Sequence, residues 1–428
     1  MRISFALLAL AASALSLHAA KDVVTVTAEK VRPARPRIPG RTFSLADFGA
    51  VGDGQTLNTS AFQAAIAAVQ RAGGGTLIVP AGTYLTRPFV LCSNLNLHLE
   101  EGAVVAAPRT FTEAGMPEPE TLHSQAEVEA RENKPAPLIT AQDVHDLELT
   151  GTGTIDGNGA HWWAWSERAG RAQAGRLVYS RPNLVEINGC ERLLVSGLTF
   201  LNSSRYHLKA ENVTDVTVDA VTVKAPFNAP NTDGIDLGPG RNFLVRNCRC
   251  DTGDDDICVK GGGVNVLIED CTILHGHGIS IGSPTQQGVD NMLVRHCTFD
   301  GNDYGLRIKS MRGAGGLVHN VKYTDIRMRN MGNAIMVFSD YTDNNRPNFK
   351  GQAGKIPSFH DILFDHVTCE STRNAGRIVG LPESRITGIT FRDVAITAAI
   401  PFEIKDADPP SYVRSTITVV PPAAPPAP

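Results

Sequence analysis

The most unusual stretch of this 428-residue sequence is "CDTGDDDICVK" at residues 250–260, where Asp254, Asp255 and Asp256 stand side by side. Adjacent carboxylates repel one another, so they do not stabilise a strand whose role is only structural. They are useful for acid–base chemistry, because crowding raises the pKa of one carboxyl group and keeps it protonated near working pH. The run therefore indicates a site of chemistry rather than a structural strand.

Further polar residues flank the aspartates at nearly regular intervals. Asp233 lies in "PNTDGID", His277 in "HGHGIS", and Arg307 and Lys309 in "GLRIK". The steps from Asp233 to Asp254, from there to His277 and from there to Arg307 are 21, 23 and 30 residues. Each residue alone has an ordinary explanation, as a turn aspartate, a loop histidine or an exposed strand face. Their common spacing predicts instead one stripe in which carboxylates, an imidazole and two cations meet.

A repeated strand pattern supplies the elements that would hold this stripe. The segments "FLVRNCRC" (243–250), "VLIEDCTI" (266–273) and "MLVRHCTF" (292–299) share alternating apolar positions, a polar corner and two further apolar positions. Similar segments begin at residues 193, 216, 321, 362 and 389. Units of this length that recur without intervening helices are typical of stacked rungs. We therefore predict an all-β fold, a parallel β-helix.

One amphipathic helix is expected before the rungs. It runs from about Thr59 to Arg71, with a Thr or Ser cap at its start and glycines after its end. Such a helix would cover the N-terminal end of the coil, whose unpaired strand edge otherwise invites aggregation.

The eight cysteines have a structural explanation in this fold. Cys248, Cys271 and Cys297 take one equivalent position on three successive rungs, which favours a buried ladder of small apolar side chains. Rungs lie about 4.8 Å apart, close enough for a disulfide between neighbours, so that alternative stays open. No paired CxxC spacing suggests zinc, and we predict no metal site.

The remaining segments define the domain organisation. Residues 1–20, "MRISFALLALAASALSLHAA", are typical of a secretory signal peptide, so a secreted or periplasmic protein without a membrane span is expected. Residues 21–40 form a Pro- and Arg-rich linker, 41–418 the β-helix, and 419–428 a Pro- and Ala-rich tail. The net charge of -4 and the lack of a basic stripe argue against nucleic acid as a partner. We expect a monomer.

The motifs "NTDG", "GDD", "GHG" and "RIK", in this order, resemble the signature motifs of glycoside hydrolase family 28, the polygalacturonases. The resemblance covers most of residues 43–400 and includes "DFGAVGDG" and "GTGTIDGNGAHWW". It implies a right-handed, pectin-lyase-like β-helix that acts on an acidic polysaccharide, homogalacturonan or pectin. The implied reaction is hydrolysis of α-1,4-galacturonosyl bonds with inversion and without a cofactor.

The same resemblance implies roles for the acidic residues. Asp254 would be the general acid, while Asp233 and Asp255 would hold and deprotonate the attacking water. His277 would assist by hydrogen bonding to the acid pair. An inverting glycosidase separates its two carboxyl groups by about 6.5–9.5 Å to admit that water, and carboxylates on adjacent rungs can meet this separation.

Binding roles follow from the resemblance in the same way. Arg307 and Lys309 would bind the carboxylate of a galacturonate unit, since both carry positive charge and Arg can bind bidentately. Tyr341, in "VFSDY", would line the substrate subsites, and Asn231 would orient the corner beside Asp233.

Two positions depart from the family pattern. Asp256 stands where members usually have cysteine, and Cys258 stands where they have a small residue, so the customary local disulfide is in doubt. Strict strand alternation would turn Asp255 away from Asp254, which predicts a bend here. The role of Asp256 stays open.

Other functions remain open at this level. A rhamnogalacturonan or xylogalacturonan hydrolase is the nearest alternative, followed by a calcium-dependent pectate lyase and a non-catalytic glycan-binding β-helix. Trp162, Trp163 and Trp165 are expected to anchor the core or a loop rather than to stack on sugars. The long insertion at 108–138 is of the kind that borders a functional groove.

Overall fold

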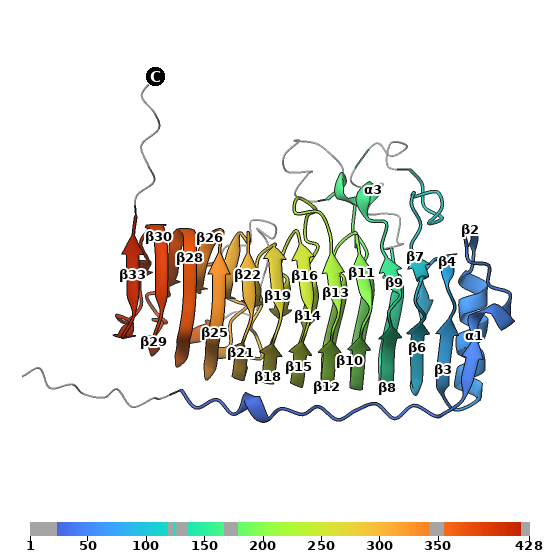
Figure 1. Ribbon diagram of the computed structural model, residues 1–428, viewed down its shortest axis with the longest axis horizontal. Coiled ribbons are helices and arrows are strands. Elements are labelled where there is room, and N and C mark those ends of the chain that lie inside the picture. Colours follow the sequence, from blue (N-terminus) through green and yellow to red (C-terminus); the bar gives the residue numbers. More distant parts are fainter. Residues whose placement is uncertain (1–23, 119–123, 125–134, 167–178, 342–354, 421–428) are drawn as a thin grey trace, which may run out of the picture.

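The computed structural model describes residues 24–118, 124, 135–166, 179–341 and 355–420. Strands stack along one axis, and every pairing between named strands is parallel (Figure 1). The predicted right-handed parallel β-helix is confirmed. The expected signal peptide and most of the expected tail fall outside the described residues. No helix among the described residues is long and apolar enough to cross a membrane.

The 33 strands of the described residues form three faces around the axis. The first face contains β1 (Thr42–Ser44), β3 (Gly75–Val79), β6 (Leu95–Leu99), β15 (Gly240–Arg246), β18 (Gly263–Glu269), β21 (Val289–Arg295), β24 (Leu317–Val318), β25 (Val321–Arg329), β27 (Ser358–Phe359), β29 (Ile389–Arg392) and β32 (Ser411–Val413). Some longer strands turn a corner and serve more than one face: β25 of the first face, which also pairs with β22, and β8 (Ile139–Gly151), β10 (Val185–Ser196), β12 (Leu208–Asp219) and β28 (Ile362–Val379).

Shorter strands complete the rungs. The second face contains β2 (Asp53–Leu57), β4 (Gly82–Leu85), β7 (Ala103–Ala106), β9 (Thr154–Asp156), β11 (Thr199–Leu201), β13 (Thr222–Lys224), β16 (Arg249–Thr252), β19 (Thr272–His275), β22 (Thr298–Asp300), β30 (Ala395–Ile400) and β33 (Thr416–Val419). The third face contains β5 (Phe89–Val90), β14 (Ile235–Leu237), β17 (Ile257–Val259), β20 (Ile279–Ile281), β23 (Tyr304–Lys309), β26 (Met331–Phe338) and β31 (Glu403–Lys405).

The register of the first face explains why the repeat folds as a coil. Phe243 pairs with Val266, which pairs with Met292, and all three are buried. Alternation then turns the intervening residues outward. Asparagines at the corners adopt positive φ, which Asn tolerates better than most residues, and they stack: Asn265 Nδ2 donates to Asn242 Oδ1 at 3.0 Å. The same inward positions on every rung give one continuous apolar core.

The cysteines confirm the ladder interpretation. Cys248, Cys271 and Cys297 are buried at equivalent places, just before β16, β19 and β22. All eight cysteines are free thiols, so the alternative of a disulfide across neighbouring rungs is wrong. Burial raises the pKa of Cys190 to about 12, which keeps that thiol protonated and inert.

The capping helix is present as α1 (Thr59–Arg71) and covers the N-terminal end of the coil (Figure 1). Phe62 of this helix stacks on Phe89 with ring centroids 4.5 Å apart. The expected Thr or Ser cap is wrong, because the N-cap residue is Asn58 and its side chain makes no capping bond. Asn58 instead joins the preceding loop, donating to the carbonyl oxygen of Val51 at 3.0 Å.

Residues 24–40 pack along the side of the coil instead of forming a free linker (Figure 1). They contain little regular structure, one short 3-10 helix, η1 (Ala28–Lys30). Ala28 and Val31 bury three outward leucines of successive rungs, which are Leu244, Leu267 and Leu293. The Pro- and Arg-rich composition suggested a linker because it shows no periodicity. The few apolar residues within it nevertheless pack on the apolar surface formed by these leucines. We refer to residues 24–40 as the strap.

Candidate active site

The register of the third face sets the candidate site. The partners Ile235, Ile257, Ile279 and Leu306 of β14, β17, β20 and β23 are preceded, two residues earlier, by Asp233, Asp255, His277 and Tyr304. Arg307 belongs to a different row, because its register partner is Ser280. The predicted stripe is thus correct in bringing these side chains together, but the expected equivalence of Arg307 with His277 is wrong.

A bend between β16 and β17 presents both catalytic candidates, as predicted. The chain leaves the strand after Thr252 and re-enters it at Ile257. Gly253 permits the bend because a Cβ there would collide with the carbonyl oxygen of Ala229. The Asp255 backbone N–H donates to Asp254 Oδ1 at 2.9 Å, which fixes one carboxylate relative to the other.

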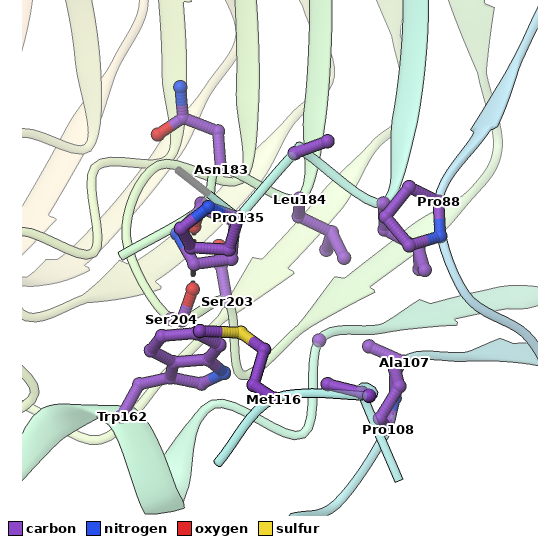
Figure 2. A pocket seen from close by; sticks show the side chains of 16 residues that line it. Pro88, Ala107, Pro108, Met116, Pro135, Trp162, Asn183, Leu184, Ser203 and Ser204 are labelled. Carbon is purple, nitrogen blue, oxygen red and sulfur yellow. Dashed lines mark hydrogen bonds between the residues drawn. The ribbon is translucent and has the colours of Figure 1, made fainter. Parts of the chain in front are cut away.

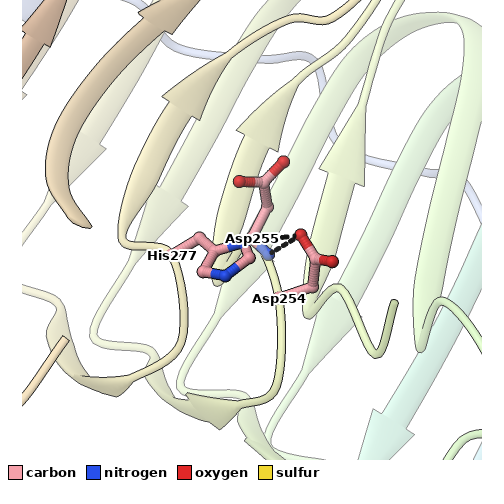
Figure 3. Close-up of side chains that lie close together, drawn as sticks. All are labelled: Asp254, Asp255 and His277. Atoms are coloured by element: carbon pink, nitrogen blue, oxygen red, sulfur yellow. Dashed lines mark hydrogen bonds and ion pairs between the residues drawn. The ribbon is translucent and has the colours of Figure 1, made fainter. Parts of the chain in front are cut away.

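Asp254 is the most exposed of the three candidate catalytic aspartates, at 9%. Its Oδ1 lies 2.8 Å from His277 Nδ1, and its Oδ2 accepts from Asn231 Nδ2 at 3.3 Å (Figure 3). Burial alone would raise the pKa of Asp254, but the charge and hydrogen bond of His277, with help from Lys309, hold it below its usual range. Asp254 and His277 therefore form a pair that can share one proton.

Asp255 carries the strongest positive surroundings. Arg307 Nη2 pairs with its Oδ1, and Lys309 Nζ lies 3.0 Å from its Oδ2. Ser280 Oγ also donates to Oδ1 at 2.8 Å. Burial would raise the pKa of Asp255, yet Arg307 and Lys309 outweigh it and lower the pKa well below the usual range. Asp255 is an ionised carboxylate whose two oxygens are both bound.

Asp233 differs from the other two in its charge state. It is 2% exposed, and burial raises its pKa well above the ordinary value despite the pull of Lys260. Lys260 Nζ pairs with Asp233 Oδ2 and also lies 2.7 Å from Asp236 Oδ2. Crowding was expected to raise the pKa of one carboxyl group; the pKa of Asp233 is raised, whereas that of Asp254, the expected general acid, is lowered.

Comparisons with known proteins decide the family. The model of "Glycosyl hydrolases family 28" matches residues 106–413. The chain belongs to glycosyl hydrolase family 28. A second model, "Rhamnogalacturonase A/epimerase, pectate lyase-like", matches residues 42–166. The predicted family is therefore confirmed, and the protein is a glycoside hydrolase.

Individual relatives agree with this assignment. A probable polygalacturonase of Vitis vinifera is 31% identical over 373 residues, which span 83% of this chain and 74% of that protein. An endo-polygalacturonase of Pectobacterium parmentieri is 28% identical over 80% of this chain and 83% of its own. The crystal structure of an exopolygalacturonase from Thermotoga maritima superposes with a TM-score of 0.76 at 25% identity, covering 91% of this chain and 95% of that chain.

Four residues of the family 28 hydrolase's site were missed from the sequence. They are Arg181, Asp236, Lys260 and Ser280. Asp236 and Ser280 occupy the middle positions of "IDL" and "ISI", in the row that continues to Arg307 of "LRI". Aligning those short strands would have revealed both. Arg181 and Lys260 stand outside the aligned strands and carry no periodic signal.

Asp256 now has a structural role in the hydrolase. Its side chain is fully buried. It accepts from Thr252 Oγ1 at 3.0 Å, from the Gly278 backbone N–H at 2.9 Å and from Asn302 Nδ2 at 3.2 Å. Asp256 thereby ties the bend that carries Asp254 and Asp255 to the turn that carries His277.

The structure also places the two expected accessory residues. Asn231 has positive φ, donates to Asp254 and accepts from Arg181 Nη2 at 2.7 Å, which fits an orienting residue. The ring of Tyr341 lies 5.4 Å from Lys309 Nζ, at the border of the cationic group. Tyr341 is thus near the site, as expected.

The hydrolase has a pocket of about 260 Å³ whose lining includes none of the candidate catalytic residues (Figure 2). Trp162, Met116 and Leu184 line it together with Ser203 and Ser204. Hydrogen bonds join its wall to the acid: Arg181 binds both the Ser204 carbonyl oxygen and Asn231, which binds Asp254. The described ends of the insertion at 108–138 line the same pocket, whereas residues 119–123 and 125–134 are not among the described residues.

The tryptophans pack as expected. Trp162, on α3 (Ala160–Trp163), is buried against Phe111 with ring centroids 4.7 Å apart. Trp163 Nε1 donates to the Ser203 carbonyl oxygen at 3.0 Å, which anchors the loop. Trp162 borders the pocket in addition.

Three side chains of the site are close enough together to hold a metal ion, but the positive charges around them disfavour one. One ligand atom each of Asp254, Asp255 and His277 lies within 4.8 Å of the others. Both oxygens of Asp255 are already bound by Arg307 and Lys309, whose charges repel a metal ion. These residues favour a site that binds anionic substrate groups.

Proposed function

We propose that this family 28 hydrolase degrades pectin by hydrolysing the α-1,4-galacturonosyl bonds of polygalacturonate in a single displacement with inversion. The observation that carries the proposal is the convergence of Asp233, Asp254 and Asp255 with two cations in one site. The names of the relatives support the substrate, because polygalacturonases recur among them.

Asp254 acts as the general acid in this proposal. Its greater exposure lets it reach the glycosidic oxygen, and its proton is shared with His277. Protonation of the leaving oxygen breaks the bond to the anomeric carbon while a water forms the new bond from the opposite face. The proton of that water passes to Asp233, which acts as the base with Asp255 beside it.

Inversion follows from the state of Asp255. A retaining reaction needs a free carboxylate as nucleophile about 5–5.5 Å from the acid. Asp255 is near Asp254, but Arg307 and Lys309 bind both of its oxygens. A carboxylate bound in this way is a poor nucleophile, so a water held by Asp233 and Asp255 takes its place.

The cations give the site an affinity for uronate units. Two positive groups, Arg307 and Lys309, share one carboxylate, Asp255, which leaves one positive charge uncompensated within this trio. A galacturonate carboxylate can bind there by charge-assisted hydrogen bonds. Tyr341 borders this position, and the pocket, whose wall is linked to Asn231 through Arg181, would hold a further sugar unit of the same chain.

Rhamnogalacturonan hydrolysis is the second candidate. The match of residues 42–166 to a rhamnogalacturonase model favours it, because the pocket takes several of its residues from this segment. A time course of product lengths on polygalacturonate and on rhamnogalacturonan separates the two and also distinguishes endo from exo cleavage. Export as a secreted or periplasmic enzyme completes the proposal, supported by the apolar segment at residues 1–20.

The deciding experiment compares Asp254→Asn with Asp251→Asn. Asp251 lies on the same strand segment, and its carboxylate contacts the half-exposed His275, outside the site. We expect Asp254→Asn to abolish release of reducing ends from polygalacturonate and Asp251→Asn to leave it within about twofold. Proton NMR of the first product formed by the wild type should show the β-anomer. An active Asp254→Asn variant would overturn the assignment, and an initial α-anomer would overturn inversion.

A further inference from the structure

Lys260 is a largely buried cation that neither the motifs nor the proposed reaction uses. It follows β17 directly, where its backbone N–H donates to the Leu237 carbonyl oxygen at 2.9 Å. Its side chain is 16% exposed, and its Nζ lies 4.2 Å from the centre of the Tyr206 ring. A backbone bond and an aromatic ring thus fix the ammonium group in place.

Lys260 joins two buried carboxylates. Its Nζ pairs with Asp233 Oδ2 and lies 2.7 Å from Asp236 Oδ2, and both aspartates are 2% exposed. Within the described part of the chain, the other oxygen of each carboxylate, Oδ1, is buried without a hydrogen-bond partner. One oxygen of Asp233 is therefore held by the ammonium group, while the other stays available to accept a hydrogen bond from a substrate water.

The charges of this group show what Lys260 does. One ammonium cannot neutralise two carboxylates, so one of the acids retains a proton over part of the working pH range. Burial raises the pKa of Asp236 to about 6 and raises that of Asp233 as well, while Lys260 lowers both. Without Lys260, the pKa of Asp233 would rise further, because Lys260 is the main positive charge that opposes the effect of burial.

Other charged and titratable groups also face Asp233. They are Asp236 on β14, Asp254 and Asp255 on the bend after β16, Lys260 after β17, and Arg205 with Tyr206 before β12; the His207 ring contacts only the Asp233 backbone oxygen. The carboxylates among them raise the pKa of Asp233, and Lys260 is the nearest opposing charge. The ionisation of Asp233 therefore depends first on its burial, and then on the balance between Lys260 and the acidic neighbours.

We propose that Lys260 is a positioning residue that, by sharing its ammonium between Asp233 and Asp236, favours the ionised form of Asp233 and orients its carboxylate as the base of the reaction. The inference rests on the proposed function, since it assigns Asp233 the proton of the attacking water. Lys260 touches neither that water nor the sugar; it holds Asp233 Oδ2 so that Oδ1 faces the reaction.

The test is the pH profile of kcat/KM on polygalacturonate for four variants. The profile falls on its acidic side as the base becomes protonated, so its acidic midpoint reports the pKa of Asp233. Lys260→Met removes the charge, and we expect the midpoint to rise by about one pH unit or more, with kcat/KM at least about tenfold lower at the wild-type optimum. Lys260→Arg should restore the midpoint.

Two further variants separate this role from a loss of folding. Asp236→Asn removes a like charge, so we expect the acidic midpoint to move to lower pH, a direction that general destabilisation does not produce. Lys209→Met is the matched control, because Lys209 is the register partner of Asp236 and also bridges two carboxylates, those of Glu186 and Glu211. Its midpoint should equal that of the wild type.

Each outcome bears on one proposal. If the wild type and Lys209→Met hydrolyse polygalacturonate but Lys260→Met keeps the wild-type midpoint, or Asp236→Asn raises it, the role of Lys260 is refuted while the proposed function stands. If the wild type does not hydrolyse polygalacturonate at any pH, the proposed function itself fails.

Discussion

The structural role of Asp256 can be tested by comparing Asp256→Asn with Asp256→Ala. The carboxylate accepts three hydrogen bonds, from Thr252 Oγ1, the Gly278 N–H and Asn302 Nδ2. An asparagine can keep all three contacts. Its oxygen would accept from Gly278 and Asn302, and its amide would donate to Thr252, whose hydroxyl can donate to the Asp254 carbonyl oxygen 3.1 Å away. An alanine leaves the Gly278 and Asn302 donors buried and unpaired.

The magnitudes follow from these contacts. Each unpaired buried donor costs about 1–3 kcal/mol of unfolding free energy, so Asp256→Ala, which leaves two, should lose about 2–6 kcal/mol. For a chain of this length the unfolding entropy makes 1 kcal/mol worth about 1 °C, which predicts a fall in Tm of about 2–6 °C. The turn at Gly278 carries His277, so kcat of Asp256→Ala should also fall by about tenfold or more.

The pH dependence adds a second, independent readout. Burial raises the pKa of Asp256 well above its usual value, more than the bonds from Thr252 and Gly278 lower it. A carboxyl group whose pKa is raised in the folded state binds more protons folded than unfolded, so its contribution to stability falls as the pH rises above about 4. Asn does not titrate, and the Tm of Asp256→Asn relative to wild type should therefore increase from pH 4 to pH 7.

Thermal unfolding followed by circular dichroism, with kcat measured on the same preparations, checks both expectations. Asp256→Asn should match the wild type at pH 4 within about 1 °C and retain most of its activity. If Asp256→Asn loses as much stability and activity as Asp256→Ala, the ionised carboxylate itself is required and the assignment of Asp256 as a neutral hydrogen-bonding anchor is refuted.

Three other predictions concern the site, the thiols and the strap. Arg307→Met should lower kcat/KM on polygalacturonate by about 100-fold or more, because Asp255 and the substrate carboxylate both lose a positive partner; a loss below about tenfold would contradict this. Dithiothreitol should leave Tm unchanged within about 1 °C, since all eight cysteines are free, whereas a larger fall would reveal a disulfide. Leu267→Ala should cost about 2–5 kcal/mol in denaturant unfolding, and the same substitution should cost less in a chain lacking residues 24–31, where Leu267 is already uncovered.

The coil and much of the site could be predicted because their signal is periodic. Outward polar residues recur with the rungs, so the spacing of Asp233, Asp254 and His277 predicts that they meet, although the register puts Asp255 rather than Asp254 in line with the other two. The bend at Gly253 was predictable from local geometry, since two adjacent strand residues cannot face one side. It was harder to assign which residues are equivalent on successive rungs, because the loops between rungs differ in length and the number of residues per rung therefore varies. For this reason Arg307 was matched with His277, although its register partner is Ser280.

The features of the site that could not be predicted from the sequence depend on single side-chain contacts. Lys260 pairs with Asp233 and Asp236 through a side chain in a turn, where no repeated pattern marks it. The charge state of each aspartate could not be predicted, because crowding alone does not determine which acid is protonated. Burial and counter-ions decide that, and Asp254 and Asp255 have strong cationic partners that adjacency does not show.

The strap imposes an order of events on the folding of the protein. The Thr27 backbone N–H donates to Asn291 Oδ1 at 2.7 Å, a contact between residues 264 positions apart. Ribosomes add roughly 5–20 residues per second, so the surface that Ala28 and Val31 cover does not exist until about 13–53 s after they are made. Rungs that form early leave Leu244 and Leu267 bare until the strap arrives. The residues synthesised first are therefore among the last to dock, and a nascent chain stopped before residue 293 would present those leucines to chaperones.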